Sequence, residues 1–149
     1  MSKADWSVPT WYFFHGFAEK VNKEYYDKNY ARCFNIIREI CCNLPCEVCR
    51  LHAVEKMNQT PNHMINTKEK LKDYLFNFHN EVSNRAGKQT FDKSILSKYT
   101  TFLPLQGYLY FTKCFFKPYH SINFNQWKRN MLLKKLNKEL LSIWHELFK

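Results

Sequence analysis

Cys46 and Cys49 form a CxxC pair, the residue pattern in this chain with the clearest chemistry. Two thiols at this spacing can close a reversible disulfide and exchange it with the thiols of another molecule. Pro45 suits an N-terminal helical position, because the N–H that it lacks has no partner in the first turn of a helix. We therefore expect a helix that begins at Pro45 and continues toward Met57, with a dipole that favours a thiolate on Cys46.

The same pair is compatible with one half of a zinc site, and the residues alone leave this alternative open. Four candidate ligands lie close together in the sequence, namely Cys42, Cys46, Cys49 and His52. No distant second pair completes the usual tetrahedron, so we expect no metal. The remaining cysteines are most simply small core residues: Cys33, Cys41, Cys42 and Cys114.

A second group of residues could form the wall of a cofactor site. His79 falls on the apolar face of a predicted helix, where a histidine is more often a hydrogen-bonded core residue than a ligand. Trp11 and His15 are one helical turn apart and add an aromatic and polar pair that faces the same interior. Together these side chains could line a flat slot between helices, as a planar aromatic cofactor requires.

Apolar residues at helical spacing predict four helices before residue 100, over residues 9–21, 27–43, 45–57 and 67–87. A short fifth helix is expected over residues 92–98, and no convincing strand precedes residue 100. Short connections between amphipathic helices favour an up-and-down arrangement. The predicted fold class is therefore all-α, a four-helix bundle with a short fifth helix and a C-terminal helical extension.

The character of the chain changes near residue 101, so we divide it into a bundle over residues 1–100 and an extension over residues 101–149. Residues 102–119 are rich in aromatic residues and receive no assignment. A long amphipathic helix is expected over residues 123–147. Its apolar stripe consists of Trp127, Met131, Leu133, Leu136, Leu140, Ile143, Trp144 and Leu147. We expect the stripe to pack on the bundle or on a second subunit, and the extension has no assigned role.

Composition excludes several classes of protein. The 149 residues carry a formal net charge of +10, but the lysines are scattered and no nucleic-acid-binding motif accompanies them, so we expect no nucleic-acid partner. The charged N-terminal segment contains no apolar run, so we expect no cleaved export signal. The longest apolar stretch is too short and too interrupted for a transmembrane segment. We therefore expect a soluble protein, cytoplasmic or nuclear.

Four motifs together resemble a known family. In order along the chain they are the TWYFFH motif of residues 10–15, the LPCEVCRLH motif of residues 44–52, the HNEV motif of residues 79–82, and Gly87-Lys88. Their order and rough spacing over residues 6–100 resemble the Erv/ALR family of FAD-linked sulfhydryl oxidases, which includes short thiol oxidases encoded by large DNA viruses. This resemblance implies a helical bundle that cradles FAD, in a viral-type member located in the host cytoplasm or the virion.

The resemblance also implies roles for individual residues. Cys49 would be the sulfur that faces the flavin, and Cys46 would exchange with the substrate. The positions that line the FAD site in the family correspond to Trp11, His15, Cys49, Tyr74, His79, Asn80, Val82, Ser83 and Lys88. Two of these depart from the family pattern, since Tyr74 replaces a common tryptophan and Ser83 replaces an asparagine.

The implied reaction is the oxidation of two thiols by O2 to a disulfide and hydrogen peroxide. Many family members carry a second shuttle disulfide, and this chain contains no second CxxC motif. We therefore expect a protein thiol substrate, such as a thioredoxin-like or small dithiol carrier protein, to reach Cys46 directly. The alternative is that one of the other cysteines relays the electrons, namely Cys33, Cys41, Cys42 or Cys114. The family also implies a homodimer. The rival interpretation is a zinc-stabilised or basic helical interaction module without enzymatic activity.

Overall fold

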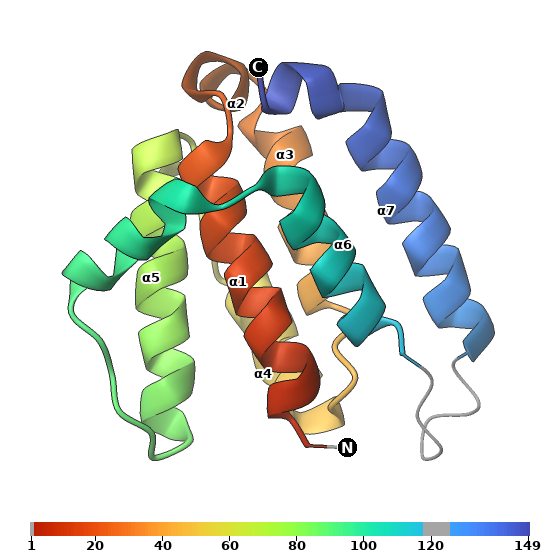
Figure 1. Cartoon of the computed structure of the whole chain (residues 1–149). Helices are drawn as coiled ribbons and strands as arrows, with labels where there is room; N and C mark the ends of the chain where they lie inside the picture. The colour runs from red at the N-terminus through yellow and green to blue at the C-terminus, as the bar shows by residue number, and fades with distance from the viewer. Residues whose placement is uncertain (1, 118–125) are drawn as a thin grey trace.

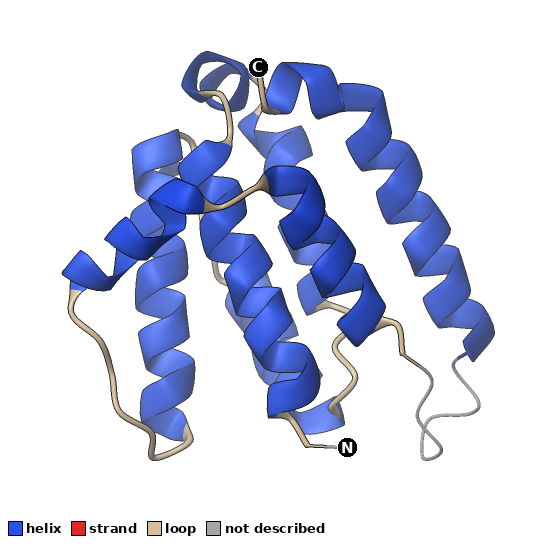
Figure 2. Cartoon of the chain, viewed as in Figure 1, coloured by secondary structure: helices blue, strands red, loops and turns tan. Residues whose placement is uncertain are grey.

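The structure, a computed structural model, describes residues 2–117 and 126–149, and all regular secondary structure in these ranges is helical (Figure 2). Seven α-helices and two 3-10 helices follow one another in the order α1 (Ala4–Lys20), α2 (Lys23–Lys28), α3 (Tyr30–Cys41), α4 (Glu47–Asn58), η1 (Asn62–Met64), α5 (Lys68–Arg85), η2 (Lys93–Thr101), α6 (Pro104–Phe115) and α7 (Gln126–Leu147). The predicted all-α class is confirmed.

Helix α1 lies at the centre of the molecule, between α5 and α6 (Figure 1). Helix α3 packs against α4 on one side and against α7 on the other. The four long helices that precede residue 100 form the predicted bundle, and η2 is the short fifth helix. Helices α6 and α7 form the C-terminal helical extension. None of the described helices is long and apolar enough to cross a membrane.

Helix α1 begins at Ala4, five residues before the predicted start at Pro9, which lies inside the helix. Proline at an internal position removes one backbone hydrogen bond. Burial of Trp6 offsets this loss, because its indole lies edge-on against the Phe115 ring of α6, at a centroid distance of 6.5 Å. Thr10 strengthens the same turn by donating its hydroxyl to the Trp6 carbonyl oxygen at 2.6 Å.

The single helix predicted over residues 27–43 is wrong at its start, since α2 and α3 are separate helices that meet at Asn29. The side-chain amide of Asn29 donates to the Tyr25 carbonyl oxygen at 3.0 Å, and its backbone N–H donates to the same oxygen. Asparagine side chains compete in this way with the helical backbone pattern, which explains the break.

Helix α6, which the sequence left unassigned, is held close to α1 by an aromatic ring. Phe102 lies against Gly16 of α1 and Gly107 of α6, and a Cβ atom at either glycine would overlap its ring. Phe102 is 1% exposed. The two glycines therefore allow a contact between α1 and α6 that no larger residue would permit.

Helix α7 differs in part from its predicted apolar stripe. Its buried face consists of Leu132, Leu136, Leu140, Ile143 and Leu147, together with Arg129. Trp127 and Met131 are exposed, so their assignment to the stripe is wrong. The predicted first turn, residues 123–125, lies outside the described residues. Side chains from α6 and α7 join the same hydrophobic core as those of the bundle, while the division of the chain at residue 100 stays a prediction.

Candidate active site

Cys46 is the N-cap of α4, and its sulfur accepts a hydrogen bond from the Cys49 backbone N–H at 3.3 Å. The helix itself begins at Glu47, so the prediction that it begins at Pro45 is wrong by two residues. The first N–H groups of a helix lack partners within it, and here the sulfur at the cap supplies one. The CxxC pair thus lies across the first turn of α4, with the Cys46 sulfur as a hydrogen-bond acceptor at the positive end of the helix dipole.

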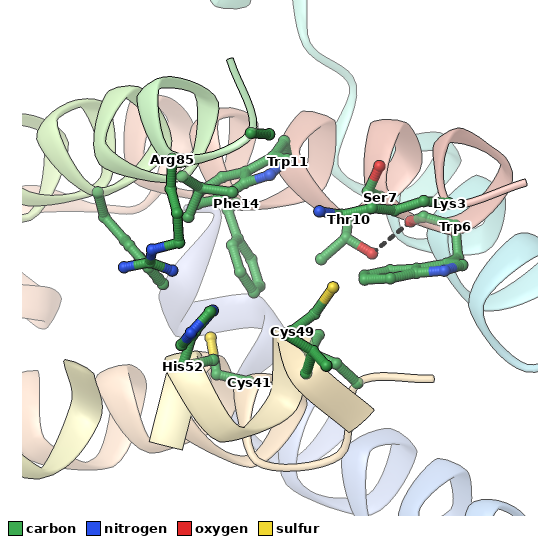
Figure 3. Close-up of a pocket in the computed structure, with 16 residues that line it drawn as sticks. Lys3, Trp6, Ser7, Thr10, Trp11, Phe14, Cys41, Cys49, His52 and Arg85 are labelled. Atoms are coloured by element: carbon green, nitrogen blue, oxygen red, sulfur yellow. Dashed lines mark hydrogen bonds between the residues drawn. The ribbon is translucent and has the colours of Figure 1, made fainter. Parts of the chain in front are cut away.

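A cavity of about 290 Å³ lies between α1, α4 and α5. Figure 3 shows Trp11 and Phe14 of α1 on one side of it and Cys49 and His52 of α4 on the other. Phe78, Val82 and Arg85 of α5 line it as well. The walls are therefore mainly aromatic and aliphatic, which is typical of a site for a planar organic ring.

The two cysteines of the CxxC pair lie differently with respect to this cavity. Cys49 lines it, whereas Cys46 is not among the described residues that do. Burial raises the pKa of the Cys49 thiol, and its hydrogen bond with Cys46 raises it further. Neither Cys46 nor Cys49 forms a disulfide in the structure. One sulfur of the pair thus faces the cavity and the other lies at the helix start beside it.

Trp11, His15 and His79 form one aromatic stack beside the cavity. The Trp11 indole lies parallel to the His79 imidazole, with centroids 4.1 Å apart and an interplanar angle of 5°. His15 Nε2 and His79 Nδ1 are 2.9 Å apart, so one ring nitrogen donates to the other. Burial is the main cause that lowers the pKa of His15 to about 3 and that of His79 to about 4. The sequence placed these three residues around one slot, and the structure brings them together as neutral rings.

Tyr74 and Asn80 lie away from the cavity, on the border of a separate, more open hollow. The Tyr74 ring is buried, and its hydroxyl is 2.6 Å from the Thr60 hydroxyl. Asn80 is hydrogen bonded twice to Phe91, donating to its carbonyl oxygen at 2.9 Å and accepting from its N–H at 3.0 Å. In this structure both side chains stabilise the frame around the cavity.

Ser83 and Lys88 belong to the C-terminal turn of α5. The Lys88 N–H donates to the Ser83 carbonyl oxygen at 2.8 Å, and Gly87 between them has a φ of +70°. This is the Schellman arrangement, in which a glycine in the left-handed region ends the helix. The chain then turns back along α5 toward η2 (Figure 1). Ser83 is buried and Lys88 is exposed, and neither lines the cavity.

Several residues that line the cavity were missed by the sequence analysis. Arg85 lies three residues after Val82 on α5. His52, considered above only as a zinc ligand, lies three residues after Cys49 on α4, so helical spacing could have assigned both to the cavity. Cys41, assigned only to the core, is 2% exposed and also lines the cavity. Lys3 has no sequence signal, because it lies before the predicted start of α1.

The residues around the cavity fit a flavin. The aromatic side chains offer flat apolar walls, and the volume lies near the lower end of ligand pockets, which span about 300–1,000 Å³. Such a space holds a ring system, so the phosphates of a dinucleotide would lie outside it. Lys3 and Arg85 line the same cavity and supply positive charge for them.

A metal site has less support from the arrangement of side chains. Within residues 2–117 and 126–149, no three His, Cys, Asp or Glu side chains gather in a way that could hold a metal ion. The zinc alternative considered from the sequence therefore has no ligand set in the described part of the chain.

Comparison with known proteins identifies the family of the chain. The model of the Erv1/Alr family matches residues 8–101, a range that contains α1 from Val8 onward, the CxxC pair, the aromatic stack and η2. Neither the curated proteins nor the solved structures gave a match.

Proposed function

The chain belongs to the Erv1/Alr family, a family of FAD-linked sulfhydryl oxidases, and we propose that it oxidises protein dithiols to disulfides with O2, which becomes hydrogen peroxide. The observation that carries this proposal is the division of the CxxC pair. Cys49 lines an aromatic cavity, while Cys46 caps α4 beside it. This arrangement suits a pair in which one sulfur meets the substrate and the other meets the cofactor.

The thiol chemistry proceeds by two exchange steps from the oxidised Cys46–Cys49 disulfide. A substrate thiolate attacks Cys46 Sγ, the Cys46–Cys49 bond breaks, and Cys49 leaves as a thiolate. The second substrate thiol then loses its proton and attacks the substrate sulfur of the mixed disulfide, so that Cys46 leaves. The substrate gains a disulfide, and the pair gains two electrons.

The residues around the cavity would hold FAD and shape its surroundings. Trp11, Phe14 and Phe78 provide flat walls, and Arg85 and Lys3 provide positive charge. The chemistry that bound FAD supplies is the acceptance of an electron pair and its delivery to oxygen. Partial burial of Cys49 raises the pKa of its thiol, so its thiolate is a strong electron donor once formed.

The partner in this proposal is a protein with its own dithiol, of the thioredoxin-like or small-carrier kind. The full sequence contains no second CxxC motif that could act as a shuttle, which supports direct access to Cys46. The homodimer, the viral origin and the location in the cytoplasm or a virion remain parts of the proposal that rest on the family resemblance.

The experiment is dithiothreitol-driven oxygen uptake by the purified protein, with hydrogen peroxide measured as the product. Cys46→Ser and Cys49→Ser are each expected to abolish turnover while the bound flavin is retained. Cys42→Ser is the matched control. It also removes a half-buried thiol close to the loop before α4, but this thiol does not line the cavity. Full turnover in either CxxC variant would refute the proposal.

A second measurement separates the two sulfurs. Incubation of the Cys49→Ser protein with the disulfide of a monothiol, such as oxidised glutathione, should trap a mixed disulfide at Cys46, which peptide mass spectrometry locates. The Cys46→Ser protein should trap the same reagent far more slowly at Cys49, because this thiol is partly enclosed and its pKa is raised. Faster trapping at Cys49 would reverse the assignment.

A further inference from the structure

A further hollow, of about 510 Å³, runs between the end of α3 and the exposed side of α7. We call it the lysine groove, because four lysines of α7 line it: Lys128, Lys134, Lys135 and Lys138. The α3 side contributes Glu39 and Asn43. The groove thus exists only because the C-terminal extension lies beside the bundle.

The groove opens next to the redox pair. Asn43, on its border, is three residues before Cys46 in the loop that joins α3 to α4. Successive Cα atoms are about 3.8 Å apart, so three steps separate these two residues by no more than about 11 Å. Figure 1 places the N-terminal end of α7 at the same end of the molecule as the start of α4. A substrate protein that reaches Cys46 would therefore also meet the groove.

The charge in the groove is positive. Lys135 is paired with Glu39 at 3.0 Å, and Glu139 lies 4.0 Å from Arg32 on α3. Both carboxylates in the groove thus already face a cation. No ion pair to Lys128, Lys134 or Lys138 is found among the described residues, so these three ammonium groups attract negative charge from outside.

Two apolar side chains extend the same surface of α7. Trp127 is 75% exposed and Met131, which lines the groove, is 47% exposed. They are four residues apart and therefore lie on one face of the helix. Exposed tryptophan and methionine next to a cluster of cations are typical of a protein-binding surface, because aromatic anchors carry much of the energy of such contacts.

We propose that the lysine groove docks an acidic segment next to the cysteines of the protein thiol substrate, and so gives the extension of residues 101–149 a role in substrate selection. This inference rests on the proposed oxidase function and names the chemistry of its partner. Carboxylates would pair with Lys128, Lys134 and Lys138, and an apolar side chain of the same segment would contact Met131. Complementary charge raises the rate of encounter and holds the substrate dithiol near Cys46.

The test compares two synthetic CxxC peptides, one flanked by glutamates and one by glutamines at the same positions. The variant is Lys134→Glu/Lys138→Glu, which reverses two exposed charges outside the aromatic cavity. Its KM for the acidic peptide is expected to rise about tenfold at low salt, since exposed ion pairs each contribute modestly. Its kcat with dithiothreitol and its KM for the glutamine peptide should stay unchanged.

The matched control is Lys70→Glu, which reverses an exposed lysine in the first turn of α5, where an acidic residue suits the helix dipole. It should leave both KM values as they are. The proposal would be overturned if the KM of the groove variant rose equally for both peptides. It would also be overturned if the KM for the acidic peptide rose as much in the Lys70→Glu protein. Binding of a single-stranded oligonucleotide that is lost in the groove variant, with no change for the acidic peptide, would also overturn it.

Docking and turnover are measured separately. Fluorescence anisotropy of a labelled acidic peptide reports binding without any oxidation, and addition of salt should weaken this binding. Absence of dithiothreitol oxidation by the unaltered protein would refute the oxidase function alone. Absence of charge-dependent peptide binding would refute the groove alone.

Discussion

Acidification should destabilise the folded protein through its buried histidine pair. His15 is 5% exposed, and its hydrogen bond to His79 needs one ring nitrogen to donate and the other to accept. Burial lowers the pKa values to about 3 and about 4, below the ordinary 6.5 that these rings regain on unfolding. The unfolded chain therefore binds more protons than the folded one below pH 6.5, and stability falls as the pH falls through this value.

The size of the effect follows from the two pKa differences. On unfolding, each histidine takes up almost no proton at about pH 8 and nearly one proton at about pH 5. Over this interval the free energy of unfolding therefore falls by about 2 kcal/mol through His15. His79 is half-buried, and solvent screening reduces its contribution to about 1–2 kcal/mol. We expect the free energy of unfolding to decrease by about 3–4 kcal/mol in total. Asp27, Glu24 and Glu69 have lowered pKa values, so the stability that they contribute is lost only at lower pH.

The assay is urea denaturation, followed by circular dichroism, at both pH values. The matched variant is His79→Gln, which keeps a polar side chain beside His15 but cannot titrate in this range. Its loss of stability over the same pH interval should be roughly half that of the unaltered protein. A loss of less than about 1 kcal/mol in the unaltered protein, or an equal loss in both proteins, would refute the reasoning.

Two further predictions concern the frame and the cavity. Gly107→Ala should lower the free energy of unfolding by about 1–3 kcal/mol, because the added Cβ displaces the Phe102 ring. Thermal denaturation measures this change, and an unchanged midpoint would contradict the close contact between α1 and α6. Trp11→Ala should weaken FAD binding at least about tenfold, because it removes one wall of the cavity and the stacking partner of His79. Titration of the apoprotein with FAD measures the affinity, and an unchanged affinity would place the flavin elsewhere.

The sequence was sufficient to predict the helices whose apolar residues recur at regular spacing. Helix α5 illustrates this, since Thr67 caps it as expected and Gly87 ends it in a left-handed conformation. The beginning of α1 could not be predicted, because it depends on contact between Trp6 and Phe115, which are far apart in the chain. At this end of α1, burial of the Trp6 side chain outweighs the local signal of Pro9 for a helix start.

The candidate site was predictable to a similar extent. Trp11, His15 and His79 were expected around one slot, and they form one stack because helical spacing directs them to the same interior. The spacing of Tyr74 and Asn80 could not show that they border a different hollow, since this depends on how Lys56 and Met64 lie beside α5. Trp127 and Met131 looked like core residues, and only the packing of α7 on α3 shows that they are exposed.

The most direct test of the account is the visible absorption spectrum of the purified protein, recorded before and after anaerobic addition of dithiothreitol. The account predicts a non-covalently bound flavin whose absorption bleaches in the unaltered protein and persists in the Cys49→Ser protein. Colourless protein that takes up no FAD, or rapid bleaching that is equal in the unaltered and Cys49→Ser proteins, would contradict the claim that Cys49 connects the substrate thiols to a flavin in the aromatic cavity.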